Sequence, residues 1–348
     1  MEHTFSLTLA MPGQVDISVI IATRNRAAML ERVLSEVQYQ ELHDLAVELI
    51  VVDNGSTDET QSVLSNESQL PLVSLYEETA GKSRALNKAL DAARGELLVF
   101  TDDDVIPCPT WLLNYYSESL EYSTAVLFCG PIVPQFPEQT PQWLSTHPSS
   151  QILFGNFQPD LPEGPLPSTL MPYGANFAAR RSAVGELRFD VQLGPSAENG
   201  RMCGEDSEFM ARLRRKGGSP IFVPSCSVVH RVTPAQIEPA ALFEKAFQMG
   251  KSTARILGKA VFLHEQYGYE FNSTDNDAKG HFERGLLINL YCGQKSELPL
   301  NCAGQSTSKL RGVLARLQVC EYTDLLSASA RQIFEKLFED SASPLPIT

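Results

Sequence analysis

The sequence lacks several features that would assign it to a particular class of protein. Its seven cysteines are odd in number and scattered, without a C-x-x-C pair, so free thiols in a reducing compartment fit it better than a disulfide framework. No uncharged apolar run approaches the ~20 residues that a membrane-spanning helix needs. Residues 1–14 lack the basic lead and long apolar core of a signal peptide. We therefore expect a cytoplasmic protein, and leave open a peripheral contact at the inner face of a membrane.

Positive charge is also scarce. The chain has 28 lysines and arginines against 42 aspartates and glutamates, for a net charge of −14. Such a chain is repelled by nucleic-acid backbones and by anionic membranes unless it carries a local basic patch, and we expect no nucleic-acid partner. The 348 residues, 43% of them hydrophobic, provide for a sizeable core and predict one large domain with an appendage, or two domains.

Strand and helix patterns alternate through the first part of the chain. Continuous apolar runs predict strands at 17–22, 47–52, 72–76 and 96–101, and helical spacing predicts helices at 29–37, from about 57 and after Gly81. Gly95 is expected to stop the last of these helices. Apolar strands alternating with amphipathic helices indicate a parallel sheet covered on both faces. Ligands bind such sheets outside the carboxyl ends of the strands.

The second part of the chain is less regular. Prolines recur through 131–172, which predicts an irregular insertion that is either a lid or binding loop or disordered. Strand-like runs return at 174–179, 221–223 and 227–230, and helical patterns follow at 240–263, 278–290 and 308–338. We expect an N-terminal segment of residues 1–14, a domain of residues 15–236 and a helical C-terminal region of residues 237–348. The last could be an acceptor platform, a dimer interface or a membrane-facing surface.

Three adjacent aspartates, Asp102, Asp103 and Asp104, follow the strand expected at 96–101. Because neighbouring carboxylates repel one another, a cation is their natural partner. Mg²⁺ usually takes one or two protein carboxylates together with substrate phosphates, and Mn²⁺ prefers similar ligands. The alternative is a solvated acidic turn. Asp53 also falls at a strand's carboxyl end, and this convergence favours a site for a metal and a phosphorylated ligand.

Five segments, in order, resemble the motifs of inverting family-2 glycosyltransferases with the GT-A fold. They are residues 18–26, 51–58, 81–87, 100–104, which match the DXD motif, and 204–209, which match the later ED motif. The resemblance covers about residues 15–232. It implies an α/β fold with a mixed, mostly parallel sheet flanked by helices, followed here by a helical extension. No Q-x-x-R-W segment follows the ED motif, which points to non-processive transfer of a single sugar.

The resemblance implies a nucleoside-diphosphate sugar as donor, with UDP as the commonest nucleotide in the family. It also implies Mn²⁺ or Mg²⁺ held by Asp104 and Asp102, with His230 as a further ligand; a histidine at that position could equally be structural. Asp103 is counted with the donor site, although its side chain is expected to point elsewhere. The residues expected to contact the donor are Thr23, Arg24, Asp53, Lys82, Arg84, Asp102, Asp103 and Asn176. For Asp53 the alternative is capping of a helix, and for Lys82 and Arg84 it is a solvated helix face.

The ED motif is expected to supply the catalytic base. By resemblance Asp206 takes the proton of the acceptor hydroxyl, with Glu205 second in line or orienting the acceptor. The alternative is that both acidic residues only favour the helix N-terminus that they occupy. Trp143 and Tyr173 are expected to stack on sugar rings of the acceptor, which could be a glycan, a lipid-linked sugar or a small molecule.

Three other functions are weighed against glycosyl transfer. A nucleotidyltransferase that makes nucleotide sugars would show a glycine-rich loop after the first strand, and residues 22–28 contain no glycine. An inactive GT-A binding module is disfavoured by the presence of Asp53, Asp102, Asp104 and Asp206. A dinucleotide-dependent dehydrogenase is disfavoured because no G-x-G-x-x-G follows the first strand.

Overall fold

The computed structural model describes residues 14–238, apart from 67, 141, 147–152, 168–169 and 197–202, together with residues 241 and 245. The helices expected in the C-terminal region, and any dimer interface that they would form, therefore lie outside the described residues. Where helices are described, none is both long enough and apolar enough to cross a membrane.

The chain divides into two compact units, and the division is interleaved. The first unit comprises Met1–Gln135, Gly155–Gly200 and Glu205–Arg231, and the second comprises Phe136–Phe154, Arg201–Gly204 and Val232–Thr348. The domain expected at residues 15–236 thus contributes two internal segments to the second unit. The second unit has a small core of its own, in which Leu144, Leu153, Phe154 and Val232 are buried.

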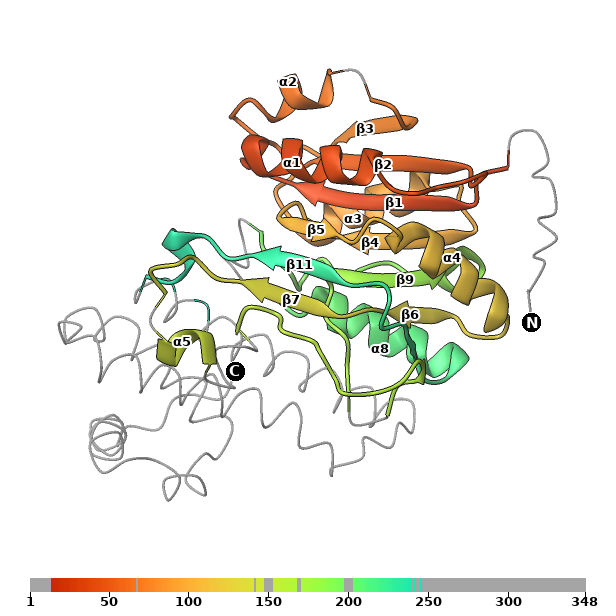
Figure 1. The fold of residues 1–348 in the computed structure, drawn as a ribbon. Coiled ribbons are helices and arrows are strands. Elements are labelled where there is room, and N and C mark those ends of the chain that lie inside the picture. The colour runs from red at the N-terminus through yellow and green to blue at the C-terminus, as the bar shows by residue number, and fades with distance from the viewer. Residues whose placement is uncertain are drawn as a thin grey trace, which may run out of the picture. The chain divides into compact units, whose positions relative to one another are not determined.

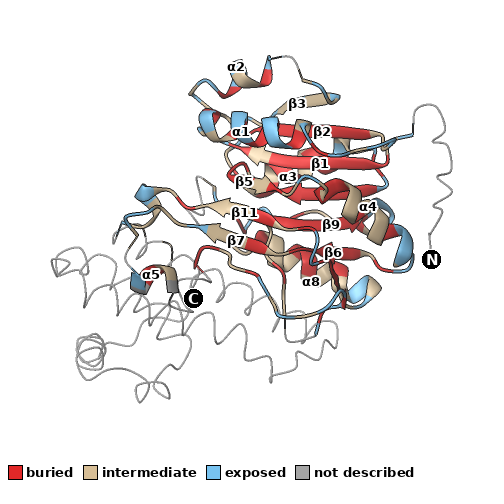
Figure 2. Cartoon of the chain, in the orientation of Figure 1, coloured by how far each residue is buried: buried red, intermediate tan, exposed pale blue. Residues whose placement is uncertain are grey.

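An eight-stranded mixed sheet forms the centre of the first unit (Figure 1). Its strands stand in the order β3 (Leu72–Tyr76), β2 (Val47–Asp53), β1 (Ile17–Thr23), β4 (Leu97–Thr101), β9 (Asn176–Arg180), β6 (Leu127–Cys129), β10 (Ile221–Phe222) and β8 (Gly164–Pro165). The first four are mutually parallel, and β9 runs antiparallel to both of its neighbours. β2 and β4 are buried along their whole length (Figure 2), as expected for strands covered on both faces.

Helices cover both faces of this sheet. They are α1 (Ala27–Gln38), α2 (Thr60–Leu64), α3 (Lys82–Ala92), α4 (Trp111–Glu121), the short α7 (Arg181–Val184) and α8 (Glu205–Gly217). The connection through α1 leads from β1 to β2, whereas that through α3 leads back from β3 to β4. Right-handed crossovers in opposite directions place α1 and α3 on opposite faces. α8 is fixed by stacked aromatic rings, because Phe209 lies 4.0 Å from Phe189 and 6.3 Å from Phe100 of β4, between ring centroids.

A smaller sheet of three strands follows the aspartates. β11 (Val228–Arg231) lies between β5 (Val105–Pro107) and β7 (Ile132–Gln135), antiparallel to β5 and parallel to β7. The structure thus places β7, α5 (Gln142–Thr146) and β8 within 131–172, which was expected to be irregular. Prolines concealed these elements, since Pro134 lies within β7 at the edge of the small sheet, where a strand tolerates proline.

Most of the expected elements of the first unit are confirmed, but the role of Gly95 is different. α3 ends at Ala92, and its C-cap is Ala93 in an extended conformation. Gly95 instead lies against β1, where a Cβ atom would stand 2.3 Å from the backbone nitrogen of Ser18. Glycine is required there for close packing of two backbone segments.

Candidate active site

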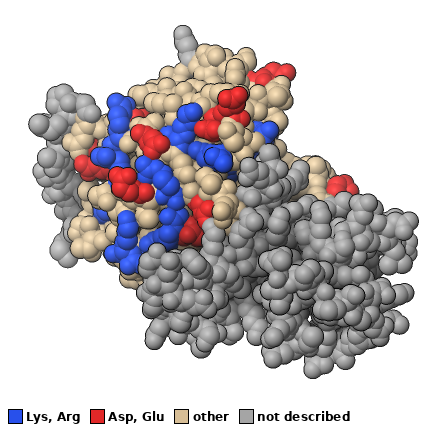
Figure 3. Space-filling model, turned by 180° about the vertical axis from the view of Figure 1, so that it is seen from behind, with Lys and Arg blue, Asp and Glu red and all other residues tan. Residues whose placement is uncertain are grey.

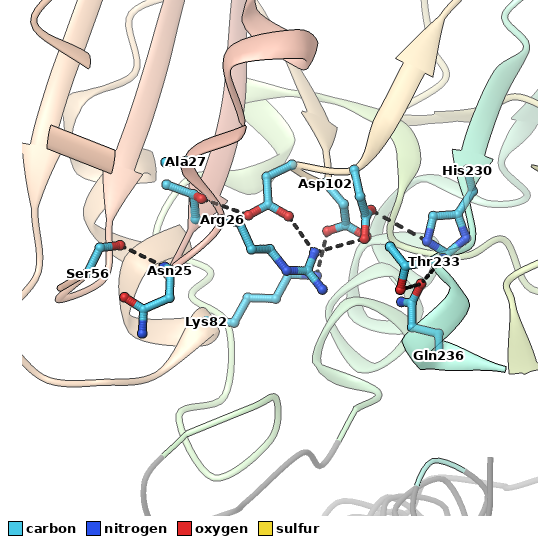
Figure 4. A network of polar contacts seen from close by, with 12 residues as sticks. Asn25, Arg26, Ala27, Ser56, Lys82, Asp102, His230, Thr233 and Gln236 are labelled. Atoms are coloured by element: carbon cyan, nitrogen blue, oxygen red, sulfur yellow. Dashed lines mark hydrogen bonds and ion pairs between the residues drawn. The ribbon is translucent and has the colours of Figure 1, made fainter. Parts of the chain in front are cut away.

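Polar residues from several strands meet at the carboxyl edge of the main sheet. Thr23, the last residue of β1, pairs in register with Asp53, the last residue of β2. The aspartates follow β4 directly, and Thr101 at its end pairs with Asn176 at the start of β9. Parallel pairing therefore brings residues far apart in the sequence to one edge, where Figure 4 shows Arg26, Lys82, Asp102 and His230 close together.

Asp53 is buried, with 2% of its surface exposed, and only one of its carboxylate oxygens is bonded. Oδ1 accepts a hydrogen bond of 2.8 Å from the backbone nitrogen of Ser56, while Oδ2 has no partner among the described residues. Asp53 does not cap the helix that follows, α2, because Ser56 lies before it and Asp58 Oδ1 bonds the backbone N–H of Thr60, the first residue of α2, at 3.1 Å. An unpaired buried carboxylate oxygen costs about 1–3 kcal/mol or more, so Asp53 is suited to accept a donor from a ligand.

Asp103 does not point away from the site. Its Oδ2 accepts a bond of 2.7 Å from Thr23 Oγ1, and its Oδ1 lies 2.6 Å from Arg26 Nη1. Burial raises the pKa of Asp103 and outweighs the opposite effect of Arg26. Because protein groups satisfy both oxygens, Asp103 supports its neighbours, and the donor contact expected for it does not fit this geometry.

Asp104 has one oxygen bonded and one open. Oδ2 lies 2.8 Å from Arg26 Nη1, whereas the buried Oδ1 accepts no hydrogen bond from the described residues and is 3.4 Å from His230 Nε2, with which it forms an ion pair when the imidazole is protonated. Antiparallel pairing of His230 with Val105, the residue after Asp104, brings the imidazole there. Burial alone would raise the pKa of Asp104, but His230 and Arg26 together lower it.

The Asp104–His230 pair bears on metal binding. In the described part of the chain, no three Asp, Glu, His or Cys side chains are placed to hold a metal ion unaided. However, the open oxygen of Asp104 facing an imidazole nitrogen is a donor set that suits Mn²⁺, or Mg²⁺ with water and phosphate oxygens completing its shell. The residues present therefore fit a divalent cation that arrives with other ligands.

Lys82, the first residue of α3, joins the two acidic groups of the site. Its Nζ lies 2.9 Å from Asp102 Oδ1, 3.1 Å from Glu205 Oε1 and 3.2 Å from Asp206 Oδ2. Burial opposes its charge, but the three carboxylates raise the pKa of Lys82 well above its ordinary value. Lys82 thus does not lie on a solvated helix face. The start of α3 is held by Asn54, whose Oδ1 accepts a bond from the backbone nitrogen of Gly81.

Glu205 and Asp206 open α8, as expected from the sequence. Glu205 is 2% exposed and its Oε2 has no partner. Burial, and then the neighbouring charge of Glu205, raise the pKa of Asp206 to about 8 against the effect of Lys82. Gly174 makes room for this carboxylate, because a Cβ atom there would lie 1.9 Å from Asp206 Oδ2. A buried carboxylate that titrates near neutrality is suited to accept a proton.

Asn176 does not reach the site. It is 0% exposed, and its side-chain oxygen accepts bonds from Trp111 Nε1 and Tyr115 Oη, at 2.9 and 2.8 Å. Its nitrogen donates to the carbonyls of Pro131 and Cys226. All four hydrogen-bonding positions of the amide are used inside the protein, so the expected contact of Asn176 with the donor does not fit, and its role is structural.

Among the described side chains, the contacts found for the aspartates involve none of the remaining expected residues. Arg24 is exposed and Arg84 half-buried, and neither forms an ion pair or side-chain hydrogen bond within the described residues. Tyr173 is half-buried and packs edge-on against Phe157, with ring centroids 6.0 Å apart. Trp143 lies in α5 of the second unit, and its side chain is outside the described set.

Sequence reasoning missed Arg26. The turn after β1 was expected to contact the donor through Thr23 and Arg24, but Arg26 makes the ion pairs with Asp103 and Asp104. Its place in the same short run as Arg24 was the available signal. The signal was unclear because the sequence does not show which of the two arginines faces the aspartates; between them Asn25 has a positive φ of 52°.

Comparison with known proteins relates the chain to glycosyltransferases, the class that its motifs resemble. Residues 18–188 match the family model described as Glycosyl transferase family 2. The succinoglycan biosynthesis protein ExoM of Rhizobium meliloti (strain 1021) is 27% identical over 257 residues, which cover 72% of this chain and 78% of that protein. Glucosyl-3-phosphoglycerate synthase of Mycobacterium tuberculosis (strain ATCC 25618 / H37Rv) is 37% identical over 110 residues, but these are 28% of this chain and 33% of the synthase.

Among solved structures, the mannosyltransferase PcManGT of Pyrobaculum calidifontis, in complex with GDP-Man and Mn²⁺, is similar in fold. Its TM-score is 0.53 at 20% sequence identity, with 93% of this chain and 84% of that chain covered. Together with the strand order of the main sheet, this likeness confirms the expected fold class.

Proposed function

Because the chain belongs to glycosyl transferase family 2, through residues 18–188, we propose that it transfers one sugar from a nucleoside-diphosphate sugar to an acceptor hydroxyl with inversion. One observation supports the proposal most directly. Asp104, a buried carboxylate with an oxygen that no described residue hydrogen-bonds, lies two residues after Asp102, and Asp102 shares the ammonium group of Lys82 with Asp206, a carboxylate of raised pKa. Asp104 is suited to the leaving nucleotide and Asp206 to the incoming hydroxyl.

The donor site of this proposal combines hydrogen-bond acceptors with cations. The unpaired Oδ2 of Asp53 would accept a bond from the base or the ribose. Asp102, whose side chain is 28% exposed, would reach the ribose. Lys82 and Arg84 stand in the first turn of α3, where the helix N-terminus and their charges favour a diphosphate. UDP is the nucleotide we propose first, from its frequency in the family; PcManGT was solved with GDP-Man, so GDP is the second.

Asp104 and His230 are the residues that we propose as metal ligands, with Asp102 reaching a metal-bound water. Mn²⁺ or Mg²⁺ bound there would stabilise the negative charge that builds on the departing diphosphate. The open Oδ1 of Asp104 and the adjacent imidazole supply the protein's part of the coordination shell. In this proposal Asp104 and His230 contact the metal, and neither contacts the base or the ribose.

The chemical step is an in-line displacement. Asp206 takes the proton of the acceptor hydroxyl while that oxygen attacks the anomeric carbon, and the bond from that carbon to the diphosphate oxygen breaks with its electron pair leaving on the nucleotide. Attack opposite to the leaving group inverts the anomeric configuration. Glu205 raises the basicity of Asp206, and Lys82 holds both carboxylates beside Asp102.

For the acceptor we propose a glycan or a lipid-linked sugar, with a small molecule as the alternative. ExoM is named for succinoglycan biosynthesis and aligns over most of both chains, which favours polysaccharide assembly. Tyr173 and Trp143 remain our candidates for stacking on the acceptor. A cytoplasmic location, with contact at the inner face of a membrane when the acceptor is lipid-linked, belongs to the same proposal.

A donor screen tests the proposal. Purified full-length protein with Mn²⁺ is expected to bind, and to hydrolyse or transfer from, at least one sugar of a UDP-, GDP- and dTDP-sugar panel. D104A should lose metal-dependent nucleotide binding. D206N should keep binding but lose about 10²–10⁴-fold in transfer, the usual contribution of a general base.

The control is D91N, which removes an exposed carboxylate whose one ion-pair partner in the described part of the chain is Arg188, and which should behave as the wild type. If D206N transfers sugar normally, Asp206 is not the base. If no nucleotide sugar binds, the donor assignment fails. Nucleotidyl transfer would appear instead as release of pyrophosphate from a nucleoside triphosphate and a sugar phosphate.

A further inference from the structure

We propose that Arg26 makes the binding of a divalent metal conditional on the nucleotide. In the free protein its guanidinium takes the position of a cation between Asp103 and Asp104, and it gives up this position when a nucleoside diphosphate enters. The inference rests on the proposed function only in assuming that such a nucleotide binds here. It assigns a role to a residue that the family motifs did not single out.

The contacts of Arg26 carry the inference. A single nitrogen, Nη1, lies 2.6 Å from Asp103 Oδ1 and 2.8 Å from Asp104 Oδ2, so one charged group bridges two carboxylates. The Arg26 side chain is 40% exposed, whereas the two carboxylates are 6% and 7% exposed. The buried acids are thus neutralised from the solvent side by a group that remains accessible. Figure 4 shows Arg26 between the turn after β1 and the side of the site where His230 lies.

The balance of charge explains why a metal alone would bind weakly. Arg26 and Lys82 together offset two of the three negative charges of the aspartate run, and Lys82 is shared with Glu205 and Asp206. A divalent ion at the open oxygen of Asp104 would stand within a few ångströms of the Arg26 charge. At an effective dielectric constant of about 20, repulsion between charges at such separations amounts to several kcal/mol.

Arg26 can move without unfolding its surroundings. It is the N-cap residue of α1, but its side chain makes no capping hydrogen bond. The backbone N–H of Ala27 is bonded by Asp58 Oδ2 at 3.0 Å, so the start of the helix does not depend on the Arg26 side chain. A diphosphate offers the guanidinium several charged oxygens in exchange for the carboxylates, and its arrival also adds ligands for the metal.

The test measures Mn²⁺ binding rather than activity. Equilibrium dialysis of the full-length protein, with free Mn²⁺ read by electron paramagnetic resonance, gives the dissociation constant of the metal without nucleotide and then with UDP or GDP. For the wild type we expect weak binding alone and binding tighter by about tenfold or more with the accepted nucleotide. R26Q should bind Mn²⁺ alone about tenfold or more tightly than the wild type does.

Two variants separate charge from other effects. R26K keeps the positive charge and should stay close to the wild type. R188Q removes an arginine of matched exposure, 37%, that pairs with Asp91 away from the site, and should bind Mn²⁺ as the wild type does. Thermal melts of each variant establish that it is folded before the metal is added.

The outcomes distinguish this inference from the proposed function. If R26Q binds Mn²⁺ alone no more tightly than the wild type, or less tightly, the inference is wrong and Arg26 only orients the carboxylates. If no nucleotide binds with or without Mn²⁺, the proposed donor site fails, while the comparison of R26Q with R26K in Mn²⁺ alone still decides whether Arg26 competes with the metal.

Discussion

At the scale of single residues, the protonation of Asp206 governs the proposed reaction. Its pKa is raised to about 8 by burial and by Glu205, so the carboxylate is half protonated at about pH 8 and mostly protonated at neutrality. Only the deprotonated form can take the hydroxyl proton. The same shift makes Asp206 bind a proton more tightly in the folded than in the unfolded chain, whose value is near 3.8. Its contribution to folding stability therefore falls as the pH rises from about 4 to about 8.

This predicts a pH profile. The kcat/KM is expected to rise about tenfold per pH unit up to about 8 and then to level off, since kcat/KM reports the ionisation of the free enzyme. E205Q should move the rising limb to lower pH, because it removes the negative charge that disfavours ionisation of Asp206. If the rise of kcat/KM with pH is unchanged in E205Q, or if kcat/KM does not vary between pH 6 and 8, Asp206 is not the base. D91N provides the reference profile.

Sequence reasoning located the acidic residues of the site better than it assigned their roles. Position at the ends of strands singled out Asp53 and Asp104, and resemblance to the ED motif singled out Asp206, which lies in the first turn of α8. The donor contacts expected for Asp103 and Asn176 do not fit the geometry, because their roles depend on which neighbours their side chains face. The amide of Asn176 is saturated by groups from α4 and from loops distant in sequence, and no local pattern records such contacts.

At the scale of elements, the site depends on a loop packed against the first turn of a helix. Gly174, before β9, leaves the space that the Asp206 carboxylate occupies at the start of α8. The three nearest atoms to an added Cβ all belong to the Asp206 side chain, and one of them is its Cβ, at 2.5 Å, which rotation of the side chain cannot move away. Alanine at 174 is therefore expected to displace the base together with the backbone that carries it, at a cost in stability.

We accordingly expect G174A to lower kcat by about 10²-fold, the effect of an ångström-scale misplacement, and to cost about 1–3 kcal/mol of stability, as overpacking does. G155A is the control: its φ of +69° is strained for alanine and nothing lies within 4 Å, so it should cost stability and not rate. Steady-state kinetics and thermal melts check both. Normal kcat in G174A would show that the carboxylate position is not critical.

The elements that could be predicted were those with a continuous apolar pattern. The strands of the first half were expected at nearly their observed bounds because a covered sheet requires unbroken apolar runs. β6 and β7 have only three and four residues, too few for a period to be read. Their pairing is decided by contacts with β9 and β11, which follow much later in the sequence.

At the scale of the whole molecule, charges of opposite sign are interleaved. The chain carries a net charge of −14, yet on the face drawn in Figure 3 basic side chains lie beside acidic ones. In the ion pairs Arg188–Asp91 and Arg212–Glu208, a basic side chain directly contacts an acidic one. Exposed pairs of this kind contribute little to stability, typically about 0–1 kcal/mol, so bound ligand should be the larger influence on the melting temperature.

The accepted nucleotide with Mn²⁺, at about 100 times its dissociation constant, should stabilise the folded protein by about 2.7 kcal/mol. The melting temperature is expected to rise by several degrees and to depend on nucleotide concentration. Differential scanning fluorimetry is sufficient to measure it. D104A should lose the part of the shift that requires Mn²⁺. An equal shift with nucleotide alone in the wild type would argue against a shared metal and donor site.

The interleaving of the two units bears on protein engineering. Because Phe136–Phe154 belongs to the same unit as Val232–Thr348, a chimaera joined to a relative at a single crossover near residue 236 would divide that unit between two parent proteins. Exchanges intended to change specificity should therefore transfer residues 136–154 together with the C-terminal region.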